Sequence, residues 1–191
     1  MIPRLVIGSK NPDKTAEIRE VVAETRLAAE IVEGLDWEDV EETGTTLEEN
    51  ALLKSRAVVA ATGLPTIADD TGLEVDALDG APGVLSSRFA GEQASYAENV
   101  SKLLGMMSGV GERSARFRTV VALVMPDGVE VTAAGALEGE IVEPPRGTRG
   151  FGYDPVFEVD GRTLSEMGVE EKNRLSHRAR AIRALCVKLG L

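Results

Sequence analysis

Two adjacent carboxylates, Asp69 and Asp70, follow a short apolar segment, residues 65–68, that predicts a buried strand. Aspartate is unfavourable within strands, and neighbouring carboxylates repel each other. Such a pair at the end of a strand is typical of a site for a cation, or for a phosphate ligand with its metal. It is also compatible with a tight turn, because Asp70 is followed by Thr71 and Gly72. The segment alone leaves both interpretations open.

Residues 9–14 form a second candidate site, where a predicted first strand meets a predicted first helix. Free backbone N–H groups at a helix start, together with Lys10 and Lys14, suit a phosphate. The glycine patterns of the P-loop and of dinucleotide-binding loops are absent. An ordinary capped helix with two solvated lysines is the alternative. The six residues are Ser9, Lys10, Asn11, Pro12, Asp13 and Lys14.

Charged side chains also gather near two other predicted helix starts. Glu41 and Glu42 lie just before a helix, where the helix dipole favours acids even without a ligand. Lys54 lies on that helix and, taken alone, is typical of a solvated surface. A basic segment opens the last helix and again suits an anion, although a sole histidine is more often structural; it contains Lys172, Ser176, His177 and Arg178.

A loop rich in glycine and proline places Phe151 and Tyr153 on either side of Gly152, followed by Asp154. Exposed aromatic side chains beside a glycine suit stacking on a flat ring, which contributes about 1–3 kcal/mol per base. The loop therefore indicates a site for an aromatic ligand.

The composition is that of a globular protein with one domain or two lobes: 191 residues, 43% hydrophobic and 28% charged. The net charge of −11 argues against sequence-independent binding of DNA or RNA. The chain has no run of 18 apolar residues, so we expect no membrane span. The N-terminus enters a strand directly, without the features of a signal peptide, and we expect a cytoplasmic protein. The single cysteine, Cys186, is expected to be a core thiol.

The predicted elements alternate between strands and helices, which indicates an α/β fold with a mixed sheet. Thr45 with Glu48, and Ser95 with Glu98, predict capping boxes at two helix starts. Residues 126–128 predict a hairpin turn between two long strands. Strands are expected at residues 4–8, 66–68, 116–125, 129–142 and 156–159, and helices at 12–25, from 45 to Gly63, from 95 to about 107, and at the C-terminus, where Leu175, Ala179, Ile182, Cys186 and Leu189 form one stripe.

The order and spacing of these segments resemble the inosine triphosphate pyrophosphatase family over nearly the whole chain, from Ser9 to Arg178. Any one segment is a weak signal, but several in the same order are specific. The matching segments are residues 9–14, Glu41-Glu42-Thr43-Gly44, Glu49-Asn50-Ala51 with Lys54, residues 67–73, residues 80–84 with Ser86 and Arg88, residues 150–155, Glu171-Lys172, and Ser176-His177-Arg178.

The resemblance implies a single domain, residues 1–191, with a mixed β-sheet, flanking helices and two lobes enclosing a nucleotide-binding cleft. It implies a homodimer that hydrolyses deaminated purine nucleoside triphosphates such as dITP, ITP and XTP. The products would be the monophosphate and pyrophosphate, which keeps these nucleotides out of DNA and RNA. The implied cofactor is Mg²⁺, with Mn²⁺ as a possible substitute.

The resemblance also implies a role for each candidate residue. Glu41 and Asp70 would hold the metal, and Asp70 would activate water beside Asp69. Residues 9–14, Lys54 and Thr71 would hold the triphosphate. The base would stack on Phe151 and meet Gly152 and Tyr153, and its edge would be read by Asp154, Lys172, His177 and Arg178.

The chain departs from the commonest family pattern at Lys10, Thr71, Leu85 and Phe89, and none of these changes removes a carboxylate or the aromatic loop. Two rival functions share much of the same chemistry. One is a pyrophosphatase of the septum-formation inhibitor type, which acts on pyrimidine nucleotides. The other is a nucleotide-binding regulator without turnover.

Overall fold

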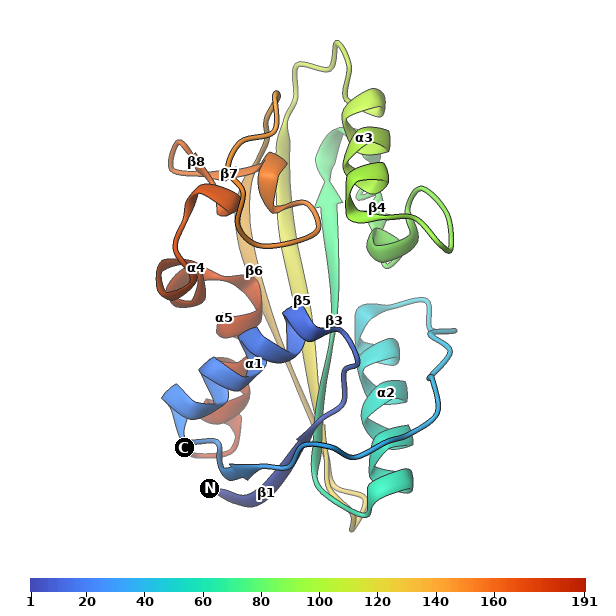
Figure 1. The fold of residues 1–191 in the computed structure, drawn as a ribbon, viewed down its shortest axis with the longest axis vertical. Helices are drawn as coiled ribbons and strands as arrows, with labels where there is room; N and C mark the ends of the chain where they lie inside the picture. Colours follow the sequence, from blue (N-terminus) through green and yellow to red (C-terminus); the bar gives the residue numbers. More distant parts are fainter. The chain divides into compact units, whose positions relative to one another are not determined.

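The computed structural model describes all residues 1–191 and has a mixed α/β fold (Figure 1). One sheet has the strand order β2-β1-β3-β5-β6-β7-β8, and β4 pairs with β3. β1 is parallel to β2 and β3, whereas β4 is antiparallel to β3, and β7 is antiparallel to β6 and β8. The strands are β1 (Ile2–Ile7), β2 (Ala28–Ile31), β3 (Thr66–Val75), β4 (Pro82–Gly83), β5 (Ser114–Val124), β6 (Glu130–Ile141), β7 (Phe157–Val159) and β8 (Arg162–Thr163).

Along the chain, five α-helices and four 3-10 helices alternate with the strands. None of the helices is long and apolar enough to cross a membrane. The α-helices are α1 (Pro12–Thr25), α2 (Leu47–Thr62), α3 (Tyr96–Met106), α4 (Val169–Leu175) and α5 (His177–Lys188), and the 3-10 helices are η1 (Asp76–Leu78), η2 (Ser86–Arg88), η3 (Asp154–Val156) and η4 (Leu164–Glu166).

The chain divides into two compact units, each with its own hydrophobic core. Unit 1 contains residues 1–70, 119–135 and 177–191, and unit 2 contains residues 71–118 and 136–176. β3, β5 and β6 each contribute residues to both units.

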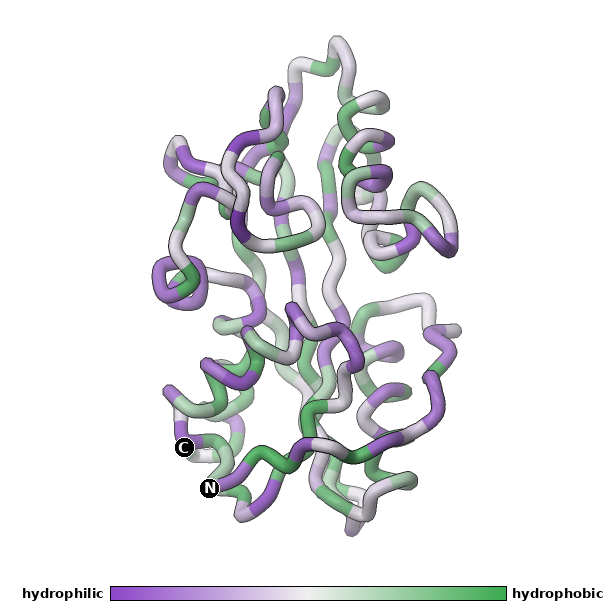
Figure 2. The backbone as a smooth tube through the Cα atoms, in the orientation of Figure 1, coloured by the Kyte–Doolittle hydropathy of each residue, from purple (hydrophilic) through white to green (hydrophobic).

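In unit 1, the core is built around β1, α1 and α5, and α1 packs against α5. The apolar run of β1 is visible as a hydrophobic stretch close to the N-terminus (Figure 2). Gly135 on β6 permits a close approach to α5, because a Cβ at this position would lie 2.3 Å from the carbonyl oxygen of His177. Cys186 is buried in this core, which confirms the prediction of a core thiol.

In unit 2, residues of β3, α3, β5, β6 and the 153–167 segment form the second core. The Ser95–Glu98 capping box is confirmed at the start of α3. The hairpin between β5 and β6 is also confirmed, since the backbone N–H of Gly128 donates to the carbonyl of Met125.

Three local predictions were wrong. Asp69 and Asp70 do not end a strand or form a turn; they lie inside β3. The capping box of α2 is one residue later than expected, formed by Thr46 and Glu49. Leu175 does not belong to the C-terminal helix, because it ends the separate helix α4, whereas the predicted start of the last helix at residues 176–178 is confirmed by α5, which begins at His177.

Candidate active site

Asp70 is the centre of a buried polar cluster in unit 1. Its side chain accepts a hydrogen bond from the Asn50 amide, at 3.1 Å from Nδ2, and lies 3.4 Å from Nζ of Lys54. The residue is only 4% exposed. Burial raises the pKa of Asp70 above the usual carboxylate value, against the opposing effects of Lys54 and Lys14. The carboxylate is therefore a stronger base than a solvated aspartate.

α2 supplies both partners of Asp70. Thr46 caps this helix, and Asn50 and Lys54 follow on successive turns of one face. The Asn50 side chain also accepts from the backbone N–H of Gly44 at 2.8 Å, which ties the acidic segment to the helix. Lys54 additionally contacts Oε1 of Glu42 at 2.7 Å. Burial lowers the pKa of Lys54, but the charges of Asp70, Asp69 and Glu42 outweigh this effect and raise it.

Asp69 has different partners, because successive side chains of a strand point to opposite faces. Its Oδ2 lies 3.1 Å from both Nε and Nη2 of Arg178, and 3.5 Å from Nζ of Lys14. Arg178 also contacts Glu17 on α1 through a short charge-assisted hydrogen bond. Burial of the guanidinium acts to lower the pKa of Arg178, but the nearby carboxylates of Asp69 and Glu17 outweigh this effect and raise it.

His177 begins α5 and is buried. Its Nδ1 lies 2.6 Å from the hydroxyl of Thr119 on β5, which holds the ring at the start of the helix. Thr119 had no counterpart among the residues predicted from the sequence.

The 9–14 segment forms a capped helix start, as predicted. The Asn11 side chain accepts from the backbone N–H groups of Asp13 and Lys14, and Pro12 is the first residue of α1. Burial lowers the pKa of the Lys14 ammonium, which Asp69 partly offsets. An anion beside Lys14 would relieve this shift, so the site favours a negatively charged ligand.

Two other predicted residues, Lys10 and Glu41, are exposed. Lys10 is exposed and forms a 2.7 Å ion pair with Asp39. Glu41 is exposed as well, and its carbonyl accepts from the N–H of Thr43. The acid that reaches the cluster is its neighbour, Glu42. Glu41 as a metal ligand therefore stays a prediction.

The carboxylates of unit 1 fit a hard divalent cation whose remaining ligands would come from a bound substrate. Glu42 and Asp70 both approach one cationic atom, Nζ of Lys54. No group of three acidic, histidine or cysteine side chains forms a cage made by the protein alone. Mg²⁺ characteristically uses one or two carboxylates, with phosphate oxygens and water completing its shell.

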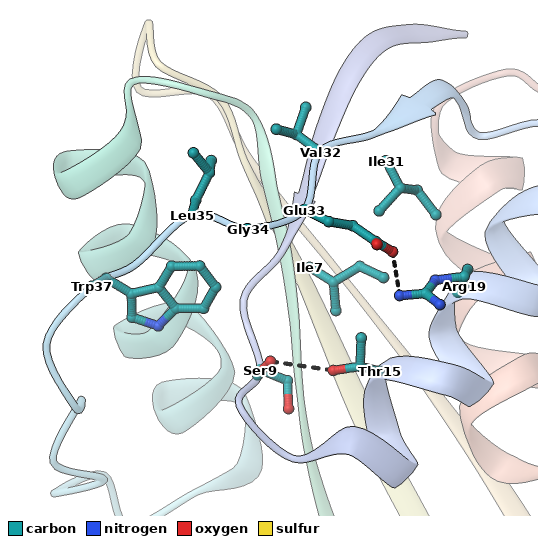
Figure 3. A pocket seen from close by; sticks show the side chains of 10 residues that line it. All are labelled: Ile7, Ser9, Thr15, Arg19, Ile31, Val32, Glu33, Gly34, Leu35 and Trp37. Atoms are coloured by element: carbon teal, nitrogen blue, oxygen red, sulfur yellow. Dashed lines mark hydrogen bonds and ion pairs between the residues drawn. The ribbon is translucent and has the colours of Figure 1, made fainter.

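A pocket of about 240 Å³ in unit 1 is lined in part by Ser9, the first residue of the 9–14 segment (Figure 3). Ser9 and Thr15 lie on one side of it, and Thr15 donates to the carbonyl of Ser9 at 3.2 Å. Arg19 and Glu33 form an ion pair at another side. Trp37, the sole tryptophan of the chain, also lines the pocket.

The aromatic loop and Lys172 come together in unit 2. Asp154 Oδ2 accepts from Nζ of Lys172 at 2.5 Å and from the N–H of Phe151 at 2.9 Å. Nζ of Lys172 lies 4.8 Å from the centre of the Phe151 ring, within range of a cation–π interaction. Gly150 has a φ of +73°, and a Cβ there would lie 2.1 Å from Asp154, so the loop requires glycine.

Tyr153, in the same loop, forms a hydrogen bond of its own. Its hydroxyl donates to the carbonyl of Ser86 at 2.9 Å, and burial raises its pKa. Gly152 has a positive φ beside it, and Thr71, the first residue of unit 2, is half-buried on β3. The prediction that Tyr153 shapes the base pocket is not tested by these contacts.

The chemistry of each unit can be considered by itself. Unit 1 holds a basic carboxylate, lysines and a capped helix start, which suit phosphates and their hydrolysis. Unit 2 holds an aromatic ring with a cation, which suits a nucleobase. These are the features of an α/β protein that handles nucleotides.

Comparison with known proteins gives the family. The sequence model of the Ham1 family matches residues 5–188, and the chain belongs to this family. A protein of Symbiobacterium thermophilum named dITP/XTP pyrophosphatase is 50% identical over 97% of this chain and 93% of its own length. A Streptomyces avermitilis protein of the same name is 44% identical over 95% and 94%. The solved structure of a HAM1 protein from Coxiella burnetii is 40% identical, covers 99% of both chains and superposes with a TM-score of 0.87.

Proposed function

We propose that this protein hydrolyses deaminated purine nucleoside triphosphates, such as dITP, ITP and XTP, to the monophosphate and pyrophosphate. Membership of the Ham1 family supports this proposal, as does the similarity to two relatives named dITP/XTP pyrophosphatase. Removal of these nucleotides would keep deaminated bases out of DNA and RNA. We further propose that the enzyme is cytoplasmic and forms a homodimer.

The observation that carries the proposal is the environment of Asp70. A general base must be deprotonated at the working pH and still have enough basicity to accept a proton. Burial increases the basicity of Asp70, while Lys54 and the Asn50 amide stabilise its charged form. Asp70 therefore takes the proton of the attacking water, and water attacks between the α- and β-phosphates.

The lysines provide the counter-charge for the triphosphate. Lys14 has a lowered pKa because its ammonium is buried near other cations. A triphosphate next to Lys14 and Lys54 supplies the negative charge that this group of cations favours. Ser9 and Thr71 offer hydroxyl donors and Asn11 offers an amide donor to phosphates, whereas the N–H groups of Asp13 and Lys14 already donate to Asn11.

Mg²⁺, or Mn²⁺ in its place, fits the carboxylates of Asp70 and of the acidic pair Glu41–Glu42. When bound, the cation neutralises phosphate charge and polarises the reacting bond. Lys54 forms ion pairs with both Glu42 and Asp70 and so fixes the positions of these two carboxylates.

Base stacking and reading of the base edge are assigned to different residues. In unit 2, the purine stacks on Phe151, and Asp154 and Lys172 fix the loop that carries this ring. In unit 1, His177 donates to the carbonyl at position 6, which inosine and xanthosine have and adenosine lacks. A site that forms such a hydrogen bond rejects the mismatched analogue by about 10⁴-fold or more. Arg178 as a direct reader of the base remains a prediction; its observed contacts are with Asp69 and Glu17.

The test of this proposal is Asp70→Asn, with Asp127→Asn in the β5–β6 turn as the control. We expect Asp70→Asn to lower kcat by about 10²–10⁴-fold while nucleotide binding is largely retained. Asp127→Asn should leave both unchanged. Near-normal turnover of Asp70→Asn would remove Asp70 from the role of base.

A further inference from the structure

Tyr96 is an exposed aromatic residue that contacts the candidate base-stacking ring. It is the first residue of α3 and is 42% exposed. The centres of the Tyr96 and Phe151 rings are 5.9 Å apart, and their planes are inclined by 41°. Tilted aromatic pairs at 4.5–7 Å attract each other. The contact therefore restricts the orientation of Phe151.

The helix start that carries Tyr96 is firmly held. Ser95 and Glu98 form a reciprocal capping box at this position. One turn further on, the buried Asn99 side chain accepts from the N–H of Ala90 at 2.7 Å and donates to the carbonyl of Ser87 at 3.0 Å. Tyr96 thus projects from a fixed support rather than from a mobile loop.

Phe151 has two other constraints, and both arise on the C-terminal side of unit 2. Its backbone is held by Asp154, and its ring lies under the ammonium of Lys172. Lys172 and Asp154 also bond to each other. The contact with Tyr96 connects the Phe151 ring to α3, a helix that is distant from Phe151 in the sequence.

We propose that Tyr96 is a positioning residue for purine recognition, fixing the plane of the Phe151 ring on which the base stacks. This inference rests on the proposed function, because it assumes that Phe151 stacks on a purine. Tyr96 is not among the candidate residues named from the sequence.

The physical consequence is specific to binding of the base. Without the Tyr96 ring, Phe151 can rotate, and part of the stacking free energy is then spent on ordering it. The aromatic pair is worth about a two- to twelvefold change in affinity. Because Tyr96 supplies neither a proton nor a charge to the reacting phosphates, kcat should stay within about twofold.

The experiment compares Tyr96→Ala, Tyr96→Phe and Met106→Ala, the last being an exposed residue at the other end of α3. Calorimetry measures binding of α,β-methylene inosine triphosphate, and steady-state kinetics measure ITP hydrolysis. Tripolyphosphate, which has no base, serves as a competitive inhibitor. We expect Tyr96→Ala to weaken analogue binding by about two- to twelvefold and to raise KM for ITP. Tyr96→Phe should behave as wild type, and the Ki of tripolyphosphate should not change.

Three results would overturn the inference. They are unchanged analogue binding in Tyr96→Ala, an equal loss in Met106→Ala, or a parallel weakening of tripolyphosphate, which would indicate general damage. Analogue binding by a wild type that hydrolyses nothing would refute the proposed function alone and leave the role of Tyr96 supported by the binding series. A wild type that does not bind the analogue would overturn both.

Discussion

Replacement of Arg178 by methionine should destabilise unit 1 strongly. The guanidinium is 1% exposed and pairs with Asp69 and Glu17, which are also buried. Methionine fills much of the same volume but leaves both carboxylates without their shared counter-charge. Removal of one partner from a buried ion pair costs about 3–5 kcal/mol, because the remaining charge stays buried. For a chain of this size, that corresponds to a decrease in Tm of roughly 6–20 °C.

Arg183 offers a matched control on the same pair of helices. Like Arg178, it lies on α5 and pairs with a glutamate of α1, in this case Glu24 at 3.0 Å. The Arg183 side chain is 32% exposed, so solvent screens the pair. We expect Arg183→Met to cost about 0–1 kcal/mol. The difference between the two variants isolates the effect of burial.

Urea unfolding followed by circular dichroism at pH 7 measures both variants, and the double variant Arg178→Met with Asp69→Asn completes the comparison. The double variant should recover part of the loss, since it removes one of the buried negative charges. If Arg178→Met costs no more than Arg183→Met, the interpretation of Arg178 as the centre of a buried charge network is wrong.

Three further predictions concern the reaction and its ligands. Lys54→Met should move the acid limb of kcat/KM to higher pH, because Lys54 lowers the pKa of Asp70 and activity requires the deprotonated base; a pH–rate profile with an unmoved limb would contradict this pairing. His177→Ala should narrow the ratio of kcat/KM between ITP and ATP, and an unchanged ratio would place base reading elsewhere. Binding of inosine triphosphate should change the fluorescence of Trp37, which lines the pocket that includes Ser9; a titration with no change at saturation would separate this pocket from the phosphate site.

Much of the fold could be predicted from local sequence patterns. Pro12 at a helix start, the turn at residues 126–128 and the glycine cap at Gly63 each depend on neighbouring residues alone, and all three are present. The capping box of α2 was misplaced because Thr45 and Thr46, each followed three residues later by a glutamate, offer two adjacent registers. The observed register uses Thr46.

The position of Asp69 and Asp70 could not be predicted in the same way. Strand propensity disfavours two aspartates, but their partners in the folded chain neutralise this penalty. Lys54 and Arg178 supply the counter-charges, and Arg178 is 109 residues away from Asp69. A local pattern contains no signal for such a pairing, so the strand was predicted to end too early.

The structure brings several predicted residues into contact, such as Asp70 with Lys54 and Asp69 with Arg178, but their supporting residues were not predicted. Glu17 binds Arg178 from 161 residues away, and Thr119 orients His177 from 58 residues away. Neither residue belongs to a motif, and both are common types in helices and strands. The one sequence signal for Glu17 is an acid among the apolar residues of the predicted first helix. Such an acid becomes buried with them and then needs a partner.

The most direct test of the central claim is pyrophosphate release from inosine, xanthosine, guanosine, adenosine and uridine triphosphates, with and without Mg²⁺. The proposed function predicts Mg²⁺-dependent release that strongly favours inosine and xanthosine triphosphates. Release from all five, or from uridine triphosphate in preference, would retain the phosphate chemistry of Asp70 and contradict the assigned base recognition. No release from any of them would contradict hydrolysis itself and favour a nucleotide-binding regulator.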